Sequence, residues 1–266
     1  MNRGRTLIVA TFALSAALAY SQTAPQPDPI PAAPRAGIPD YPGVRTEVPG
    51  IWLPPVANAP FTATVDIVSH EKLPDGTEHI RTTTNHIARS SSGRIYNERR
   101  LLVTTAFQGL PPLLSAHTYD PGTRLSVVME SRTHLAKQTI LAHPTPAIAG
   151  QSPIHINPNP GPGRTEEDLG TQNYQGYTLQ GIRKTRAVAA TASGTGQPIT
   201  ISDEYWFSPD LTVYFIIKHN DPRTGEQLVV INHVERAEPE ASVFAIPSEF
   251  KIVDETPPPQ PPPPGR

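Results

Sequence analysis

The sequence predicts a mainly β protein: an antiparallel sheet of consecutive hairpins with few short helices. Two features of residues 171–253 predict this class. Runs rich in β-branched and aromatic residues alternate there with turns of Gly, Pro, Asp and Ser, and the two clearest turns lie at residues 208–210 and 221–225. Runs and turns at this spacing are typical of hairpins placed side by side, and not of a nucleotide-binding α/β unit.

The first residues are typical of an export signal. Arg3 and Arg5 supply a positive start, residues 7–19 are almost entirely apolar, and small residues follow. We therefore expect a signal peptide at residues 1–21. The alternative is an uncleaved membrane anchor, but the apolar run is shorter than the roughly 20 residues of a spanning helix.

The absence of cysteine excludes lipid attachment and thiol chemistry. With no cysteine in the chain, there is no acceptor for a lipid near the cleavage site, and no disulfide, thiol nucleophile or thiolate metal site. The mature protein is expected to leave the cytoplasm by the general secretory route. It should be soluble, unlipidated and periplasmic or extracellular, without a transmembrane segment.

Proline marks the expected domain boundaries. Many of the 33 prolines gather in residues 25–60 and 257–264. We expect a proline-rich disordered leader at residues 22–50, a single β-rich domain at 51–254 and a polyproline tail at 255–266. The tail is either a spacer or a ligand for aromatic grooves. Inside the domain, the proline-rich loop 143–163 is either a floppy insertion or a flap over a binding face.

The first half of the domain shows the period of two that strands require. Phe61, Ala63, Val65 and Ile67 fall on one face, whereas the residues between them are polar. A turn at residues 73–76 leads into further expected strands at 78–89, 94–103, 114–119 and 124–130. Residues 131–141 fit either a strand or a short helix.

The second half is expected to begin with a short helical turn at residues 165–168, where acidic side chains would lie near its positive end. Strands are then expected at 172–174, 177–189, 199–207, 211–220 and 227–235. The strand at 211–220 is apolar on both faces, with Val213, Phe215 and Ile217 on one side and Tyr214 and Ile216 on the other. It is therefore expected near the centre of the sheet.

Composition and motifs exclude several functional classes. The net charge of −2 does not favour nucleic acid. No phosphate-cradling loop and no Gly-x-Ser-x-Gly elbow is present, and the nine histidines lack metal-ligand spacing. His219 and His233 are either neighbours across a hairpin or two surface histidines at strand ends. No catalytic, cofactor-binding or metal-ligating residue is predicted.

The carboxylates show no catalytic pair, because their positions along the chain are scattered. Turn or solvent roles are expected by default for Asp66, Glu98, Glu130 and Glu226.

A cluster of arginines occupies residues 81–100. Period-two geometry places Arg94 and Arg100 on one face with Tyr96 and Glu98, and Arg99 on the other. Two interpretations stay open. The cluster is either a patch for anionic head groups or cell-wall polymer, or a solvated sheet face on which Glu98 forms ion pairs. Its members are Arg81, Arg89, Arg94, Arg99 and Arg100.

The motifs at residues 51–61, 93–99, 204–211 and 221–226 resemble those of uncharacterised exported bacterial proteins. In fold, these look like outer-membrane lipoprotein carriers (LolA-like) and the sensor domain of periplasmic stress regulators (RseB-like). The resemblance covers about residues 51–254. It implies a strongly curved antiparallel sheet, an unclosed half-barrel, whose concave side holds an acyl chain. Ser90 departs from the acidic residue expected before the Gly-Arg turn, and no catalytic residue is carried over.

Three functions follow from these observations. The first is a secreted, non-enzymatic binding or carrier protein with an apolar concave face for a lipid-like ligand, because a curved apolar sheet face requires a cover. The second is an envelope structural or sensory module that binds a protein partner through its sheet edge or tails, and the third is a hydrolase. The expected ligand-binding residues, which alternatively form a closed core, are Val65, Ile67, Val127, Val213, Phe215, Ile217 and Val229.

Overall fold

The computed structural model describes residues 51–73, 75–142 and 152–258, which all belong to one compact unit. The predicted signal peptide at 1–21 and leader at 22–50 lie outside the described residues. So do residues 143–151 of the predicted proline-rich loop and the tail from residue 259 onward. Residues 152–163 of that loop contain no strand or helix.

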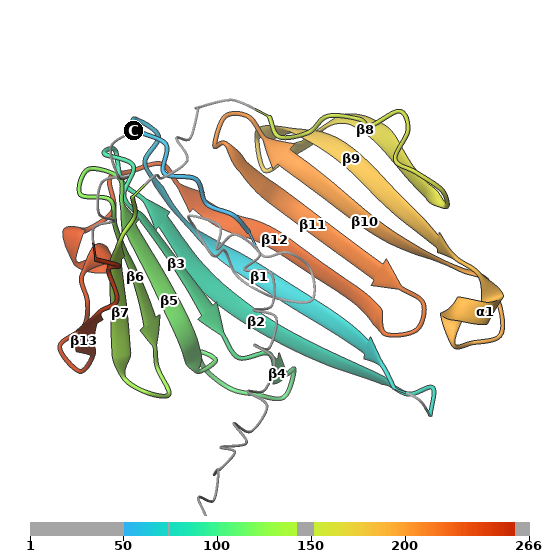
Figure 1. Ribbon diagram of the computed structural model, residues 1–266, viewed down its shortest axis with the longest axis horizontal. Helices are drawn as coiled ribbons and strands as arrows, with labels where there is room; N and C mark the ends of the chain where they lie inside the picture. Colours follow the sequence, from blue (N-terminus) through green and yellow to red (C-terminus); the bar gives the residue numbers. More distant parts are fainter. Residues whose placement is uncertain (1–50, 74, 143–151, 259–266) are drawn as a thin grey trace, which may run out of the picture. The chain divides into compact units, whose positions relative to one another are not determined.

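The described residues form one 13-stranded sheet, which is dominated by antiparallel pairs and is not closed (Figure 1). Its order is β13-β7-β6-β5-β3-β2-β1-β12-β11-β10-β9-β8, and β4 pairs with β2 outside this path. The strands are β1 (Phe61–Lys72), β2 (Glu78–Arg89), β3 (Ile95–Arg100), β4 (Val103–Thr104), β5 (Leu113–Asp120), β6 (Leu125–Glu130), β7 (Leu135–Ile140), β8 (Arg164–Tyr174), β9 (Tyr177–Val188), β10 (Ile199–Ser208), β11 (Val213–Asp221), β12 (Gly225–Glu235) and β13 (Lys251–Asp254).

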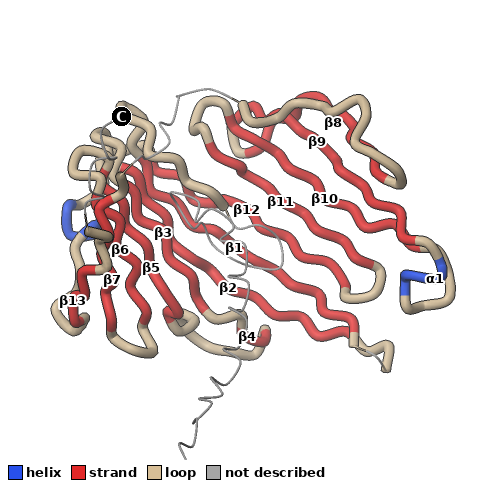
Figure 2. Tube along the Cα trace, viewed as in Figure 1, coloured by secondary structure: helices blue, strands red, loops and turns tan. Residues whose placement is uncertain are grey.

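The predicted fold class, a strongly curved antiparallel sheet of consecutive hairpins, is confirmed. One run of neighbouring strands leads from β1 to β7 and a second from β8 to β12, and the pairing of β1 with β12 joins the two runs. Strands dominate the trace, and the helices are the single turns α1 (Ala190–Ser193) and η1 (Ala241–Phe244) (Figure 2). In the described part of the chain, no helix has the length and apolarity needed to cross a bilayer.

The predicted turn at residues 221–225 joins β11 to β12, and its last residue must be a glycine. Gly225 has φ 109°, and a Cβ at this position would lie 1.8 Å from the carbonyl oxygen of His70 on the neighbouring strand β1. The turn therefore brings the two backbones closer together than any side chain allows.

The helical turn expected at residues 165–168 is wrong, because these residues lie inside β8. Glu166 pairs with Lys184 on β9 at 3.1 Å and Glu167 with Arg183 at 2.8 Å, so the acidic side chains face cations across the ladder. Residues 131–141, which fitted either a strand or a short helix, contain a strand, β7, at Leu135–Ile140. The short strand β13, which pairs with β7 in parallel, is not predicted by the sequence.

The largest apolar cluster gathers buried side chains from both runs of strands. It contains Phe61, Ile87, Ile95 and Ile231 from the sheet, together with Ile51 and Leu53 from the segment before β1. The Arg89 side chain is also fully buried, at 0% exposed. It donates hydrogen bonds to the carbonyl oxygens of Pro54 (3.2 Å), Ala59 (2.8 Å) and Leu211 (2.8 Å). One cation thus connects the segment before β1, the end of β2 and the turn before β11.

A second, smaller cluster lies on β5, β6 and β7 and consists of Ala116, Val127, Met129 and Ala136. The chain returns to it after β12. Ile246 and Phe250 pack against it, and the Arg94 guanidinium lies 4.8 Å from the centre of the Phe244 ring. We refer to residues 241–250, which run from η1 to the start of β13, as the roof segment. Its position over the sheet creates the site described next.

Candidate functional site

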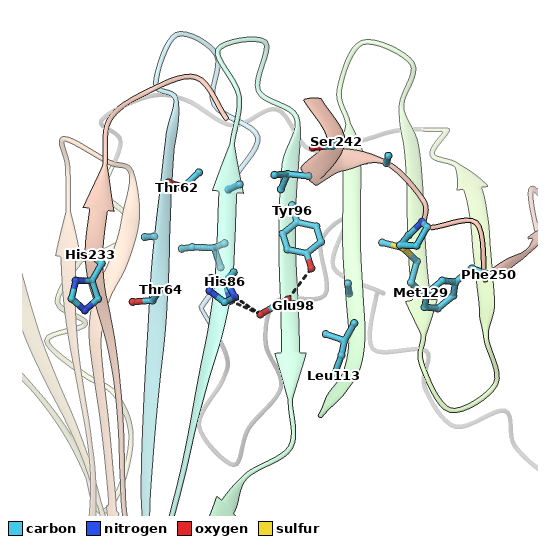
Figure 3. Close-up of a pocket in the computed structure, with 17 residues that line it drawn as sticks. Thr62, Thr64, His86, Tyr96, Glu98, Leu113, Met129, His233, Ser242 and Phe250 are labelled. Atoms are coloured by element: carbon cyan, nitrogen blue, oxygen red, sulfur yellow. Dashed lines mark hydrogen bonds and ion pairs between the residues drawn. The ribbon is translucent and has the colours of Figure 1, made fainter. Parts of the chain in front are cut away.

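A pocket of about 480 Å³ lies between the sheet and the roof segment (Figure 3). Its sheet side comes from β12, β1, β2, β3, β5 and β6, which are neighbours in the sheet order, and its other side comes from η1 and the residues that follow it. The lining residues are Thr62, Ala63, Thr64, His86, Ile87, Ala88, Tyr96, Glu98, Leu113, Ala116, Met129, His233, Ser242, Val243, Ala245, Pro247 and Phe250.

One end of the pocket is apolar. Small side chains on the sheet leave room for it. Ala88 on β2 and Ala116 on β5 form part of the sheet side, while Met129 and Phe250 border the pocket near the smaller cluster. Figure 3 places Met129 and Phe250 on the far side of β5 from the polar residues. A pocket of this size, mostly apolar with a few polar groups, is typical of small-molecule sites.

The polar end of the pocket is organised around Glu98, whose side chain is only 3% exposed. Its Oε1 accepts hydrogen bonds from the His86 backbone N–H (2.8 Å), from His86 Nδ1 (2.7 Å) and from Arg100 Nε (2.7 Å). Its Oε2 accepts from the Tyr96 hydroxyl (2.9 Å) and from Arg100 Nη2 (3.0 Å). These contacts hold Tyr96 and His86 in place at the pocket wall, as the dashed lines in Figure 3 show.

The electrostatics of this network favour the ionised carboxylate. Burial alone raises the pKa of Glu98, but the hydrogen bonds from His86, Arg100 and Tyr96 outweigh it and lower this pKa to about 2. Because an ionised carboxylate only accepts hydrogen bonds, His86 Nδ1 must carry the proton in its contact with Glu98. The same contact raises the pKa of His86, and burial together with the charge of Glu98 raises the pKa of Tyr96.

A β-bulge brings a second histidine to the pocket. The register between β1 and β12 shifts between Thr62, which pairs with Glu235, and Thr64, which pairs with Asn232. His233 lies in this interval with φ 50°, a left-handed conformation that is uncommon outside glycine. Bulges change the direction of the side chains they carry, and His233 is one of the pocket-lining residues.

Next to the pocket, a polar network links β1, β2 and β12. The Asp66 carboxylate accepts from the Thr84 hydroxyl at 2.7 Å and from Asn232 Nδ2 at 2.6 Å. Asn232 Oδ1 in turn accepts from the Tyr174 hydroxyl at 3.1 Å. The solvent role expected for Asp66 is thus wrong: its two oxygens connect three neighbouring strands.

The seven predicted ligand-binding residues are all buried, and none of them lines this pocket. Six belong to the largest apolar cluster, while Val127 lies in the smaller cluster beside Ala116 and Met129. On β1, the alternation that sends Thr62 and Thr64 to the pocket sends Val65 and Ile67 to the opposite face. Their part in ligand binding stays a prediction.

The predicted grouping of Tyr96, Glu98 and Arg100 on one face is confirmed by their mutual hydrogen bonds. The solvent role expected for Glu98 is wrong, because its carboxylate is buried and fully paired. The spacing Tyr96-x-Glu98-x-Arg100 on one strand is the signal that points to this network. His86 carries no such local signal, since only strand pairing brings it to Glu98.

His219 and His233 are not neighbours across the hairpin. His219 forms a hydrogen bond with Asp203 at 2.7 Å and pairs with Gln227 on β12, six residues before His233.

No family model matches the chain, and no curated protein matches it. A comparison with solved structures does find matches. An uncharacterised conserved protein from Thermus thermophilus has 7% identity and a TM-score of 0.37, and the match covers 74% of this chain and 91% of that one. A LolA superfamily protein from Nitrosomonas europaea has 10% identity and a TM-score of 0.26, over 71% and 91% of the two chains.

A third similar structure is the Mycobacterium tuberculosis lipoprotein LppX, with 8% identity, a TM-score of 0.28 and coverage of 64% and 84%. A LolA superfamily protein is thus among the solved structures that the comparison finds. Likenesses at these TM-scores and identities are too distant to assign a ligand or an activity. Within the described residues, no group of three or more His, Asp or Glu side chains is placed to hold a metal ion.

Proposed function

We propose that this protein is an exported, non-enzymatic binding or carrier protein that holds a lipid-like molecule in the pocket under the roof segment. The observation that supports it is the pocket itself: an apolar space of about 480 Å³ with one hydrogen-bonding end. Its volume falls within the roughly 300–1,000 Å³ of small-molecule sites.

The position of the roof segment supports entry and exit of a ligand. It is anchored by side-chain contacts, with Phe244 against Arg94 and with Phe250 against the smaller cluster. The sheet side belongs to strands joined by backbone hydrogen bonds, and the roof segment is fixed at its C-terminal end, where β13 pairs with β7. A ligand can therefore enter by displacement of the roof segment without unfolding of the sheet.

A pair of matched variants tests this proposal. Thr62 lines the pocket and Thr82 does not, and both are half-buried strand threonines on the same sheet face. The variant Thr62→Trp should fill the pocket and weaken binding of the neutral apolar dye N-phenyl-1-naphthylamine by at least about tenfold, roughly 1.4 kcal/mol. Thr82→Trp should bind the dye like the wild type. Equal binding by all three proteins, or none by the wild type, would contradict the proposal.

The same titration separates this pocket from the lining predicted by the sequence. Val229 is fully buried on the opposite face. The variant Val229→Ala should lower the stability, as large-to-small core changes do, and leave dye affinity unchanged at a temperature where it is folded. A loss of dye binding in folded Val229→Ala, with none in Thr62→Trp, would place the ligand against the predicted residues instead.

A further inference from the structure

The Glu98 carboxylate has no capacity left for a ligand. An ionised carboxylate offers about four lone-pair sites, and within the described residues five N–H and O–H groups reach its two oxygens. Arg100 does not line the pocket, and its remaining nitrogen donates to the carbonyl oxygen of Pro111 at 2.9 Å. A ligand at this end must therefore bind to other groups.

Two imidazole rings remain available. The His86 side chain is 49% exposed, its Nδ1 is held by Glu98, and its Nε2 has no partner among the described residues. The His233 ring, on the bulge of β12, makes no hydrogen bond or ion pair with another residue of the described ranges. The strand between them is β1, where Thr64 pairs with both His86 and Asn232. Figure 3 shows His233, Thr64 and His86 in a row.

The acidic groups around these rings are already paired or lie at the margin. Glu98 is neutralised by Arg100, and the two oxygens of Asp66 accept from Thr84 and Asn232. Glu235, which pairs with Thr62, is exposed at the end of β12. Arg94 adds a further cation beside the roof segment. The polar groups that can reach a ligand at this end are thus the two imidazoles and the Thr62 hydroxyl, because the Thr64 hydroxyl already donates to the carbonyl oxygen of Asn232 at 3.2 Å.

We infer that the pocket takes an amphiphile with an anionic head group, a carboxylate or a phosphate monoester, which binds between His86 and His233 while its tail fills the apolar end. This inference rests on the proposed function and specifies its ligand class. With Nδ1–H held by the Glu98 carboxylate, a protonated His86 ring donates from Nε2, and the His233 ring supplies an N–H in either tautomer, so an anion can bind both, whereas an ammonium head group would face the cationic ring.

Four probes with one tail test the inference: dodecanoate, dodecyl phosphate, dodecanol and dodecylammonium, titrated by calorimetry at pH 6, where the raised pKa of His86 favours its cationic ring. Wild-type protein should bind both anions at least about tenfold more tightly than dodecanol, and dodecylammonium more weakly than dodecanol. Acetate and inorganic phosphate, which carry the head group without the tail, should bind far more weakly than their dodecyl counterparts.

The variants His86→Gln and His233→Gln should each lose about tenfold in affinity for the two anionic amphiphiles and keep their affinity for dodecanol. His79→Gln, an exposed histidine outside the pocket, is the matched control and should match the wild type. Circular dichroism establishes that each variant is folded.

The outcomes are distinguishable. Dodecanol binding as tight as dodecanoate binding, with no effect of either histidine variant, would overturn the inference and leave the proposed function standing. Acetate or phosphate binding as tightly as the amphiphiles would overturn the amphiphile assignment. No binding of any tailed probe or of the neutral dye would overturn both proposals.

Discussion

Glu98 is the residue on which the polar end of the pocket depends. Its carboxylate connects β2 and β3 through His86, Tyr96 and Arg100, and its burial leaves almost no water contact to replace these bonds. A buried charge of this kind is stable only while each partner is present, because an unpaired ion in the interior is strongly destabilising. The geometry of both His86 and Tyr96 follows from this one side chain.

The variant Glu98→Gln should therefore lower the free energy of unfolding at pH 7 by about 3 kcal/mol, because the positive Arg100 loses its counter-ion. Urea unfolding followed by circular dichroism measures this loss. Glu130→Gln is the control, since Glu130 makes only exposed or half-exposed contacts, with Lys137 at 3.8 Å and the Thr133 hydroxyl at 3.3 Å, and should change stability by no more than about 0.5 kcal/mol. Equal effects of the two changes would contradict the role assigned to Glu98.

The same pair of proteins should show a defined pH dependence. The pKa of Glu98 is lowered from 4.5 to about 2 in the folded state, so its stabilising contribution is present above the unfolded-state value and is lost as the pH falls toward 2. The stability difference between wild type and Glu98→Gln should therefore shrink as the pH falls between about 4.5 and 2. It should also decrease as the pH rises above about 6.5, because Glu98 raises the pKa of His86 and deprotonation of that ring removes their ion pair. A difference that does not change with pH over the acidic window would show that Glu98 acts by packing alone.

At the scale of elements, one buried cation makes three of the hydrogen bonds that join the segment before β1, β2 and the turn before β11. Arg89 at the end of β2 donates to Pro54 and Ala59 of that segment and to Leu211 in the turn before β11, and its guanidinium lies 4.9 Å from the centre of the Phe61 ring. Burial lowers the pKa of Arg89 to about 10, which still leaves it charged at neutral pH. Charge-assisted bonds to three carbonyls offset the cost of burying this charge.

Replacement of Arg89 should be costly for this element. Arg89→Met leaves three carbonyl groups without this donor, and we expect it to lower the free energy of unfolding by about 3 kcal/mol or more. Arg89→Lys keeps the charge but lacks the planar fork that reaches several carbonyls, so it should recover only part of the loss. Arg132→Met, at an exposed turn, serves as the control in the same urea titrations. Full recovery by lysine would show that charge, and not the geometry of the fork, holds the segment.

At the scale of the whole molecule, the open sheet leaves two edges in the described residues, β8 and β13. An open edge offers unpaired N–H and C=O groups to another chain, and charged side chains discourage such pairing. β8 carries three consecutive acidic residues, Glu166, Glu167 and Asp168. We interpret this run as protection of the longer edge against association.

Removal of these charges should promote self-association. The triple variant Glu166→Thr, Glu167→Thr, Asp168→Thr should show a larger weight-average mass than the wild type at equal concentration in sedimentation equilibrium, because threonine favours strands and removes the repulsion. A control that loses three exposed charges elsewhere, Glu226→Thr, Glu240→Thr, Glu249→Thr, carries the same net charge and should behave like the wild type. Equal masses for the two variants would assign the effect to net charge instead of the edge.

Most of the strands and their faces follow from local patterns in the sequence, but β13 and the first part of β8 do not. The bounds of β2 agree with the pattern at residues 78–89, and the alternation at Phe61–Ile67 separates a buried face from the Thr62 and Thr64 face that the pocket uses. The predicted grouping of Tyr96, Glu98 and Arg100 also follows from one strand. These features depend on periodicity and turn residues, which act over a few neighbouring positions.

The position of the pocket follows from strand pairing and from the return of the chain after β12, and not from any local sequence pattern. The pairing of β1 with β12 brings His233 near His86, and the return of the chain after β12 places Phe250 over β5–β7. The residues concerned are more than a hundred positions apart in the chain, and the bulge that exposes His233 leaves no mark in the local pattern. Each of these contacts depends on loop closure and on which strands become neighbours, and neither is encoded in the period of any single segment.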